Sequence, residues 1–599
     1  MPTIEPEPAG TVCDTLLRAV SASFCCCVGV VLIIRACSVP GSGTLAPLMP
    51  TITGRRAFLQ LLLDEGVTHL FGNPGTTELA IMEAVPQFPQ LEFVLGLQES
   101  VVVAMADGFC RASGRLAAAN VHVMPGLGNA MGALYNAKFS GSPVILTAGQ
   151  QEQGHGLLEP MLYEPLVPVA QPLVKWAVEV TRAADLPRIL HRAAKIALTP
   201  PTGPVFLSLP GDVLDETVEM DLGRPVRVDA ATRPADPSLA RIADALLKAR
   251  RPAILAGHEL ATRDAFVEAG ELAERLGAAV YASSIPYTAQ FPTDHPAFMG
   301  AFSRAQKQVR SALEAHDLLL VLGADLLRMS VYSPVEPLPP ELPVIHVSER
   351  APELGKNYRT DIAVEADVKQ TLQALLPLVR ARADMASAAA RLAELKGRNW
   401  SAQRDKARVD AMLAAETKPI DPQYLMLRFT EALPRDAVVI DEGLVSTYPL
   451  PRLLPLRGPR DYYGLASGGL GFAIPGAVGV SMALPGRPIA VVAGDGAAMY
   501  SIQGLWTAAH HRLPITYLIA NNRGYRIIKE RLVSFRKTDK FTGMDLRDPE
   551  IDFVAAAKSM GVAARRLTDP QDIGPALREA FASGKPNLID VRVADGFGS

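Results

Sequence analysis

Short apolar runs alternate with longer amphipathic stretches from residue 55 onward. In the first block the apolar runs occupy 68–72, 93–98, 116–123, 143–149 and 204–210. Apolar runs of this length, separated by segments with helical periodicity, are typical of buried strands in a parallel sheet. The pattern therefore predicts an α/β domain in which helices cover both faces of the sheet.

The same alternation occurs twice more along the chain. A linker rich in Pro, Arg and Asp at 222–237 precedes apolar runs at 252–260, 278–284, 317–325 and 343–349. An Ala- and Arg-rich helical stretch at 378–415 leads to runs at 437–443, 488–496, 515–522 and 587–593. We expect three doubly wound parallel-sheet α/β domains, bounded at 49–225, 233–380 and 416–599.

The first 48 residues do not fit this pattern. Their apolar run at 19–34 is shorter than the roughly 20 residues of a spanning helix, and acidic residues precede it, unlike a signal peptide. Met1–Ile4 recurs as Met49–Ile52, immediately before the first predicted helix. Our hypothesis is that Met49 is the natural start; a targeting or membrane-associated leader is the alternative, which N-terminal sequencing would reveal.

Composition narrows the classes of partner. The 599 residues are 49% hydrophobic and 20% charged, and the formal net charge is −3, so no strong basic field attracts nucleic acid. Five of the six cysteines fall in the first fifty residues, and the rest of the chain carries only Cys110. That usage excludes a disulfide framework and is typical of a reduced, cytoplasmic protein.

Glycine-rich segments do not match the dinucleotide-binding fingerprint. After the run ending at residue 123, Gly126 and Gly128 are followed by a glycine only at Gly132, and the segment from Gly468 to Gly471 also lacks the required spacing. Neither segment shows an acidic ribose partner in a βαβ unit. This argues against a nicotinamide-dependent dehydrogenase.

The clearest chemical signal lies in the third block. Gly494–Asp495–Gly496 and Asn521–Asn522 each follow a hydrophobic run, so both fall at carboxyl ends of predicted strands, where open α/β sheets bind ligands. A carboxylate on a tight turn and an amide oxygen from a neighbouring strand suit Mg²⁺, which commonly bridges to phosphate. The alternative is an ordinary turn aspartate and an asparagine that ends a strand.

These residues resemble a known motif. Gly494–Gly496, followed by twenty-four residues and then Asn521–Asn522, is similar to the thiamine diphosphate (ThDP) motif of the 2-oxo acid decarboxylase and acetolactate synthase superfamily. The segments 71–79, 97–109, 120–137, 291–298 and 468–479 resemble benzoylformate decarboxylases most. The resemblance implies a pyrimidine-binding, a central and a diphosphate-binding domain, with ThDP and Mg²⁺ as cofactors.

Glu99 is an ionisable group embedded between Leu97 and the valines 101–103. An unpaired carboxylate in such surroundings is penalised by desolvation, so we expect a partner for it. The resemblance implies that Glu99 hydrogen-bonds the aminopyrimidine ring of the cofactor and favours its imino tautomer. The alternative is a helix-start glutamate that interacts only with its own backbone.

Three further residues are catalytic candidates by resemblance. His122, within a predicted strand that ends in a Pro-Gly turn, and His295 match the two active-site histidines of benzoylformate decarboxylases, and histidines exchange protons near neutral pH. Thr76 stands where that family has a serine that contacts the substrate carboxylate. A packing role for the histidines and a helix-capping role for Thr76 are the alternatives.

The resemblance also implies the cofactor contacts. The backbone carbonyl of Gly468 would accept from the aminopyrimidine amine, and Leu470 would hold the cofactor in its bent form. The remaining cofactor contacts would come from Glu99, Gly494, Asp495, Gly496, Ala497, Asn522 and Tyr525, with Mg²⁺ bound by Asp495, Asn522 and the carbonyl of Gly524. Because Glu99 and Asp495 meet across a subunit interface in that family, we expect a homodimer or homotetramer.

Two departures put the acyl group of the substrate in doubt. Gly464 stands where benzoylformate decarboxylases have a phenylalanine after two tyrosines, and 525–531 carries three cations in place of an apolar segment. A larger or anionic acyl group, such as a nucleotide-bearing thioester, becomes conceivable. We expect decarboxylation of a 2-oxo acid to an aldehyde and CO₂; a carboligase or lyase and a non-catalytic homologue are the alternatives.

Overall fold

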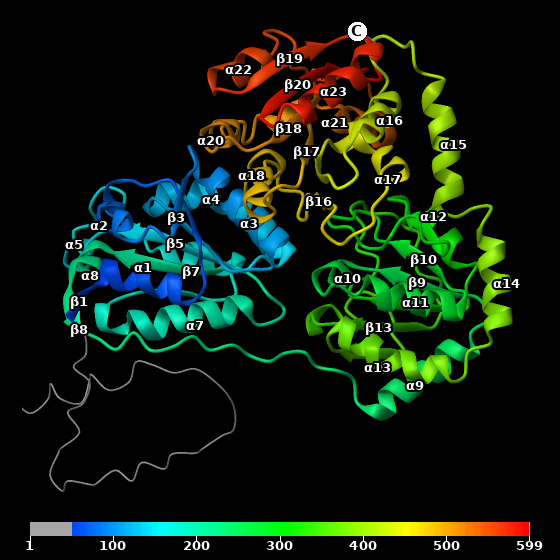
Figure 1. Cartoon of the computed structure of the whole chain (residues 1–599), viewed down its shortest axis with the longest axis horizontal. Coiled ribbons are helices and arrows are strands. Elements are labelled where there is room, and N and C mark those ends of the chain that lie inside the picture. The colour runs from blue at the N-terminus through cyan, green and yellow to red at the C-terminus, as the bar shows by residue number, and fades with distance from the viewer. Residues whose placement is uncertain (1–50, 598–599) are drawn as a thin grey trace, which may run out of the picture. The chain divides into compact units, whose positions relative to one another are not determined.

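The computed structural model describes residues 51–597 and contains three six-stranded parallel sheets (Figure 1). The first has the strand order β3-β2-β4-β5-β7-β6. Its strands are β2 (His69–Gly72), β3 (Glu92–Leu95), β4 (Ala117–Val121), β5 (Val144–Gln150), β6 (Ala177–Glu179) and β7 (Val205–Pro210). The strand that follows β2 in the chain, β3, lies on one side of β2, and the next strand, β4, lies on the other side. The topological switch point of this sheet therefore lies between β2 and β4.

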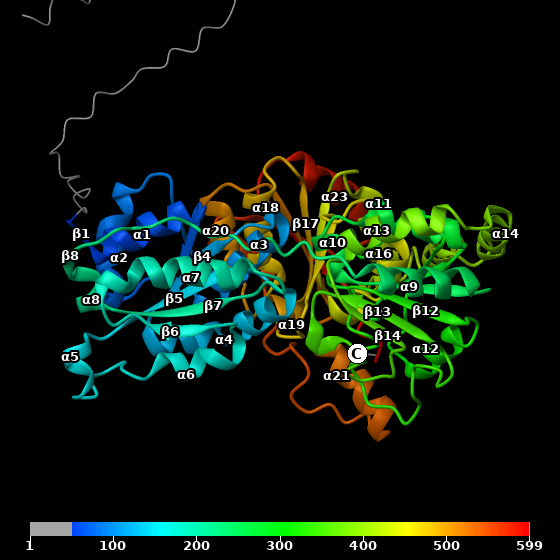
Figure 2. The same ribbon diagram turned by 90° about the horizontal axis from the view of Figure 1, so that it is seen from below.

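Helices cover both faces of this first sheet (Figure 2). On one face α1 (Gly54–Asp64) and α7 (Leu186–Leu198) share one apolar core with the strands. On the other face lie α3 (Glu99–Ser113), α4 (Val123–Ser140) and α6 (Leu166–Ala170). A short antiparallel pair, β1 (Thr51–Thr53) and β8 (Thr217–Glu219), joins the two ends of the domain.

The central sheet has the strand order β11-β10-β9-β12-β13-β14. Its strands are β9 (Pro252–Ala256), β10 (Ala279–Ala282), β11 (Phe298–Ala301), β12 (Leu318–Leu322), β13 (Val344–Ser348) and β14 (Ile362–Glu365). Its helices are α9 (Asp236–Lys248), α10 (His258–Thr262), α11 (Phe266–Leu276), α12 (Gln306–Leu313) and α13 (Val368–Arg380). The switch point of this sheet therefore lies between β9 and β12.

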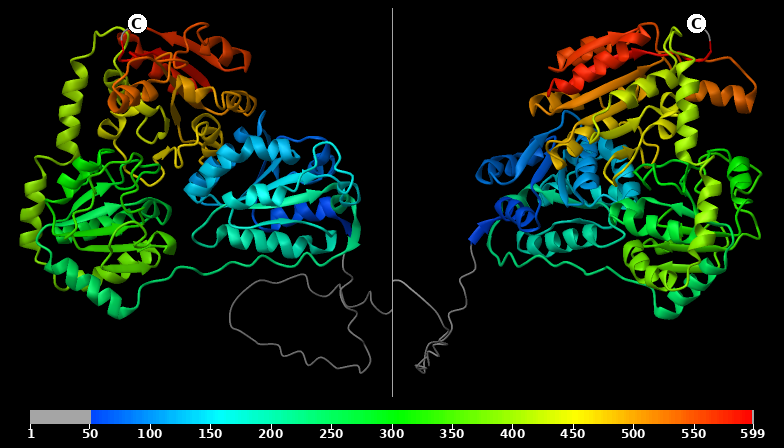
Figure 3. Two further views of the ribbon diagram at one scale, coloured as in Figure 1. Left: turned by 180° about the vertical axis from the view of Figure 1, so that it is seen from behind. Right: turned by 45° about the vertical axis from the view of Figure 1, so that its right-hand side comes forward.

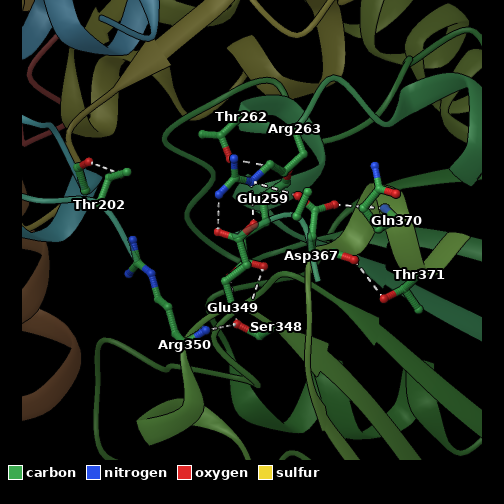
Figure 4. Close-up of polar contacts among 12 residues, drawn as sticks. Thr202, Glu259, Thr262, Arg263, Ser348, Glu349, Arg350, Asp367, Gln370 and Thr371 are labelled. Carbon is green, nitrogen blue, oxygen red and sulfur yellow. Dashed lines mark hydrogen bonds and ion pairs between the residues drawn. The ribbon is translucent and has the colours of Figure 1, made fainter. Parts of the chain in front are cut away.

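A polar network fills part of the carboxyl edge of the central sheet (Figure 4). Glu259, just after β9, accepts from the Ser348 hydroxyl at 2.6 Å and from the Glu349 N–H at 3.0 Å. Glu349 forms a two-point ion pair with Arg263, whose Nε also lies 3.3 Å from Asp367 Oδ2. The network closes the edge beside β9, β13 and β14 with the chain's own side chains.

The third sheet repeats the topology of the first, with the order β16-β15-β17-β18-β20-β19. Its strands are β15 (Val438–Glu442), β16 (Tyr462–Gly464), β17 (Ile489–Gly494), β18 (Ile515–Asn521), β19 (Ala563–Leu567) and β20 (Asn587–Arg592). Among its helices are α16 (Pro422–Ala432), α18 (Ala473–Ala483), α19 (Asp495–Ala498), α21 (Arg526–Arg531), α22 (Phe553–Ser559) and α23 (Ile573–Ala582). Its switch point lies between β15 and β17.

Two close helix contacts join the first and third domains. The α3 and α18 helices pack face to face, and a Cβ on Gly108 would meet the Gly476 carbonyl oxygen at 2.2 Å. A Cβ on Gly479 would meet the Met105 carbonyl oxygen at 1.9 Å. Only glycine permits backbones to approach this closely. The two domains consequently share one apolar core.

The prediction of three parallel-sheet α/β domains is confirmed. The helical stretch predicted at 378–415 consists of the end of α13, then α14 (Met385–Leu395) and α15 (Trp400–Met412), which follow the central sheet in the chain (Figure 3). Residues 1–48, with the proposed start at Met49, lie outside the described residues. Between residues 51 and 597, no helix is both long and apolar enough to cross a bilayer.

Candidate active site

Glu99 begins α3, directly beyond the carboxyl end of β3, and is 7% exposed. Asn73, which follows β2, donates its amide to Oε1 at 3.1 Å, and Asn129 on α4 donates to Oε2 at 3.0 Å. Gly126 leaves the space beside the carboxylate, since a Cβ there would lie 3.3 Å from Glu99 Oε1. The expected partners of this buried acid are therefore two side-chain amides, and each oxygen keeps a further lone pair for a ligand.

The imidazole ring of His122 contacts the buried carboxylate of Glu78. Its Nδ1 lies 2.9 Å from Oε2 of Glu78, which is fully buried, and 3.1 Å from the Thr77 hydroxyl. Glu78 also accepts from the backbone N–H groups of Gly75 at 2.8 Å and Gly149 at 2.9 Å. Because all of these contacts make Glu78 an acceptor, Nδ1 of His122 carries a proton and Nε2 is the nitrogen available for proton exchange.

The backbone around His122 is shaped to hold the ring in place. A Cβ on Gly75 would meet the His122 Nδ1 atom at 2.1 Å, so only glycine admits the imidazole at this turn. Val123 has a φ of 35°, a left-handed conformation that β-branched residues rarely adopt. Such strain persists where surrounding contacts fix it.

One local expectation about this segment needs correction. His122 does not lie within a strand that ends in a Pro-Gly turn: β4 stops at Val121, and Pro125 and Gly126 lie in the first turn of α4. A helix tolerates proline there because its first N–H groups have no intrahelical partner. The role assigned to Thr76, which is exposed in the single chain, stays a prediction; its neighbour Thr77 is the residue whose hydroxyl reaches His122.

The third domain places a second buried acid at its switch point. Asp495 follows β17 and accepts from the N–H groups of Gly496 at 2.8 Å and Gly524 at 3.1 Å. Burial raises the pKa of Asp495 to about 6, against these hydrogen bonds. Asn522, which follows β18, is 5% exposed, and its Oδ1 is buried without a hydrogen-bond partner in the described chain.

The other predicted cofactor residues surround Asp495 or the loop before α18. Gly494 ends β17, and Gly496 and Ala497 are buried in α19. The Tyr525 ring packs on Gly496, where a Cβ would meet it at 2.7 Å. Gly468 has a φ of 90°, which only glycine adopts freely, and Leu470 follows it in the loop.

Two residues that the sequence reasoning missed support this loop. Glu442, buried at the end of β15, accepts from the N–H groups of Gly471 at 2.6 Å and Ala473 at 2.7 Å, and burial raises its pKa to about 7. Asn136 of α4 accepts from the N–H groups of Ala466 at 3.0 Å and Ser467 at 3.1 Å. The loop is thus fixed by both flanking domains.

His295 lies in the central domain, whereas His122 lies in the first domain. His295 sits between β10 and β11, edge-on to Phe291 at 5.1 Å between ring centroids, with Nε2 3.4 Å from Glu274 Oε1. Burial lowers the pKa of His295, while Glu274 opposes that effect. Within the described chain no hydrogen bond or ion pair joins His295 to His122, or Glu99 to Asp495. The roles assigned to them remain predictions.

The residues at the third-domain site fit a hard cation. One carboxylate, one unpartnered amide oxygen and the carbonyl of Gly524 are all oxygen donors, as Mg²⁺ prefers. A cation there would relieve both the desolvation of Asp495 and the unsatisfied Asn522 oxygen. Within 51–597 no cluster of three or more His, Cys, Asp or Glu side chains forms a metal site of another kind.

The three domains match three family models in chain order. Residues 52–161 match the N-terminal thiamine pyrophosphate (ThDP) binding domain, 239–375 the central domain and 446–591 the C-terminal ThDP-binding domain of thiamine pyrophosphate enzymes. Fold and site thus define a ThDP-dependent enzyme. This chain belongs to the ThDP-dependent 2-oxo acid decarboxylase and acetolactate synthase superfamily, on the benzoylformate decarboxylase side.

Individual relatives agree with this assignment. The chain is 34% identical to benzoylformate decarboxylase of Pseudomonas aeruginosa over 90% of its own length and 98% of that protein's. It is 26% identical to the large subunit of acetolactate synthase isozyme 3 of Escherichia coli, over 91% and 95% of the two chains. A solved structure of ThDP-dependent 4-hydroxybenzoylformate decarboxylase from Rhodococcus jostii superposes with a TM-score of 0.80 at 31% identity, covering 91% and 100%.

The sequence contained a signal for some of the missed residues. Asn73, Glu78 and Asn129 all stand inside segments that carried the resemblance, but their partners are distant in sequence: Glu78 lies 44 residues from His122 and 71 from Gly149. A buried glutamate next to two threonines looks like an ordinary capping residue. Only the fold shows that it supports the histidine.

Proposed function

We propose that this protein decarboxylates a 2-oxo acid to an aldehyde and CO₂, using ThDP and Mg²⁺, as a reduced cytoplasmic enzyme. The observation that carries the proposal is the pairing of a buried, amide-held Glu99 with the Glu78-supported His122 at one switch point, while Asp495 and Asn522 occupy the equivalent point of the third domain. The similarity to benzoylformate decarboxylase supports it.

Each residue has a defined task in this proposal. Bound ThDP would supply a carbon nucleophile and accept the electron pair that CO₂ leaves behind. Asp495, Asn522 and the Gly524 carbonyl would hold Mg²⁺ and, through it, the diphosphate. Glu99 would hold the proton of the pyrimidine ring, with Asn73 and Asn129 fixing its carboxylate.

His122 would move the proton that the aldehyde product gains. Its Nε2 faces away from the Nδ1–Glu78 contact, and Glu78 stabilises a positive charge on the ring. Thr76 stays the predicted contact of the substrate carboxylate, and the Thr77 hydroxyl, 3.1 Å from Nδ1, would help to hold the ring of His122. His295 stays a predicted second proton carrier.

We propose that the site is built from two copies of the chain. The family resemblance supports this, because Glu99 and Asp495 meet across a subunit interface in that family, so that one cofactor would be held by Glu99 of one protomer and Asp495 of the other. A symmetric pair creates two such sites at once, which supports a homodimer or a homotetramer built from two dimers.

A carboligase is the second candidate. It is supported by the similarity to acetolactate synthase and by the altered pocket at Gly464. The deciding experiment supplies the purified chain with ThDP and Mg²⁺ and follows CO₂ and aldehyde over aromatic, aliphatic and CoA-linked 2-oxo acids. We expect equal amounts of CO₂ and aldehyde. Release of CO₂ without aldehyde, with a longer 2-hydroxy ketone formed instead, would favour the carboligase, and neither product would refute both.

A further inference from the structure

A cavity of about 830 Å³ lies between the central and third domains. One wall comes from loops at the carboxyl edge of the central sheet, including His258 after β9 and Asp325 after β12. The other wall comes from the segments 444–448 and 465–468 of the third domain. Pockets of roughly 300–1,000 Å³ hold ligands of drug size. The cavity therefore connects Gly468, a predicted cofactor contact, to the switch point of the central sheet.

Gly464 keeps one wall of this cavity thin. A Cβ added there would lie 3.0 Å from the Tyr462 hydroxyl and 3.3 Å from the Pro286 carbonyl oxygen, and both of those residues line the cavity. A phenylalanine at this position, as in the resembling family, would have to displace them. This pocket therefore differs at Gly464 from a pocket that an aromatic side chain closes.

Most charged groups in the cavity wall are neutralised locally. Asp325 accepts from Arg328 at 3.3 Å, and burial lowers the pKa of His258 to about 3, so the histidine is neutral. Asp441 accepts from the Tyr462 hydroxyl at 3.0 Å, and burial raises its pKa. Glu442 is engaged by the loop N–H groups described above. These groups add little net charge to the cavity.

Arg304 and Arg452 also line the cavity, and neither forms an ion pair within residues 51–597. Of the two, Arg304 is the one held by an aromatic ring. It follows β11, and its guanidinium lies over the Tyr448 ring at 4.7 Å, with Nη1 donating to the Tyr448 hydroxyl at 3.3 Å. In the chain from 51 to 597 no carboxylate lies within 4.0 Å of its nitrogens. The aromatic contact holds the side chain while most of its N–H donors stay free, and a guanidinium fork matches a carboxylate in two parallel hydrogen bonds.

We propose that this cavity binds the distal part of an elongated 2-oxo acid, and that Arg304 receives a second carboxylate at the far end of the acyl chain. The inference rests on the proposed function, in which Gly468, at one end of this cavity, is a predicted contact of the cofactor. It assigns the substrate class as dicarboxylic 2-oxo acids. A neutral chain end of the same length would leave the exposed guanidinium without a carboxylate partner.

Matched substrate pairs test the proposal by turnover. The holoenzyme is given 2-oxohexanedioate against 2-oxohexanoate, and 4-carboxybenzoylformate against benzoylformate. We expect the parent to show a kcat/KM at least about tenfold higher for the dicarboxylic member of a pair. Arg304→Gln should bring this ratio close to one, mainly through KM, and Arg304→Lys should keep part of it. Lys307→Gln, an exposed cation outside the cavity, is the control that should preserve the ratio.

A binding measurement separates this inference from the proposed function. Titration calorimetry of the cofactor-free chain with hexanedioate and with hexanoate needs no turnover. We expect tighter binding of hexanedioate by the parent and loss of that preference in Arg304→Gln, with unchanged circular dichroism melting. This result without turnover of any 2-oxo acid would refute the function alone. Equal binding of both acids, or a variant that binds hexanedioate as the parent does, would overturn the inference.

Discussion

The first and third domains have the same strand order, yet their switch points treat a buried acid in opposite ways. Glu99 has a side-chain amide on each carboxylate oxygen. Asp495 accepts from backbone N–H groups, those of Gly496 and Gly524 among them, and the neighbouring Asn522 oxygen has no partner within the described residues. Glu99 thus receives its side-chain hydrogen-bond donors from its own domain. Asp495 instead lies next to a further oxygen acceptor, that of Asn522, which has no donor in the described residues.

That contrast indicates which kind of ligand each site favours. A carboxylate already oriented by two amides can hold a proton on a ligand with little rearrangement. A buried carboxylate beside an unsatisfied oxygen costs free energy until a cation neutralises both. In our proposal, the same fold thus supplies an acid–base position in the first domain and a cation position in the third.

The largest effect is expected at Glu99. Replacing it by Gln keeps its size but removes the proton acceptor, so CO₂ release should fall at least about 100-fold while the melting temperature stays close to that of the parent. The exposed Glu219→Gln is the control. A Glu99→Gln protein that releases CO₂ as fast as the parent would remove the acid–base role from this site.

The next effect is expected at Asp495. Asn at this position removes the only carboxylate of the proposed cation site, so the affinity for ThDP with Mg²⁺ should weaken roughly tenfold or more. Thermal shift with added ThDP and Mg²⁺ measures it, and chelating Mg²⁺ in the parent should have the same result. The exposed Asp539→Asn should respond like the parent. An undiminished shift in Asp495→Asn would place the cation elsewhere.

A third buried acid, Glu259, offers a calibration away from both sites. Desolvation raises its pKa to about 7, against hydrogen bonds from Ser348 and the Glu349 N–H. A raised folded-state pKa means that stability present below about pH 4.5 is lost as the pH rises through 7. The loss is on the order of 3 kcal/mol.

The Glu259 effect is measured as a difference. The free energy of unfolding of the parent minus that of Glu259→Gln should decrease between pH 4.5 and 7.5 in urea titrations. The exposed Glu365→Gln on β14 should give a flat difference over the same range. A flat difference for Glu259→Gln as well would mean that this acid is not desolvated in solution.

The smallest effect sharpens the comparison directly. Asn522→Leu removes the unpartnered oxygen and should raise the free energy of unfolding of the cofactor-free protein by about 1 kcal/mol, while abolishing the Mg²⁺-dependent shift. Asn129→Leu should lower that free energy, because it leaves one Glu99 oxygen without its donor. Stabilisation by both substitutions, or by neither, would show that the two sites are not opposite in kind.

The buried architecture could be predicted from the sequence, because central strands are covered on both faces. The strands β5, β17 and β18 are wholly buried and read as continuous apolar runs. The edge strands β6 and β19 are short and partly exposed, and they carry no such run. Their pairing is decided by neighbouring strands distant in the chain, so local pattern does not reveal it.

The residues of the candidate site also fall into those that the sequence predicts and those that it does not. Glu99, Asp495 and Asn522 were identifiable because each sits at a fixed position after a strand. The support of His122 by Glu78 and Thr77 depends on backbone directions around Gly75 and Val123, which the sequence does not express. The open Arg304 could not be foreseen, since a surface arginine and a free one look alike until their surroundings are known.

The glycine seam between α3 and α18 also constrains how such chains can be recombined. Gly108 and Gly479 put a backbone carbonyl where a β-carbon would otherwise stand. A chimaera that takes its first domain from one parent and its third from another would keep this close contact between the two helices only if the parents supply glycine at these two positions. A larger side chain at either position would push α3 and α18 apart. Libraries of recombined chains should therefore keep these two helices from the same parent.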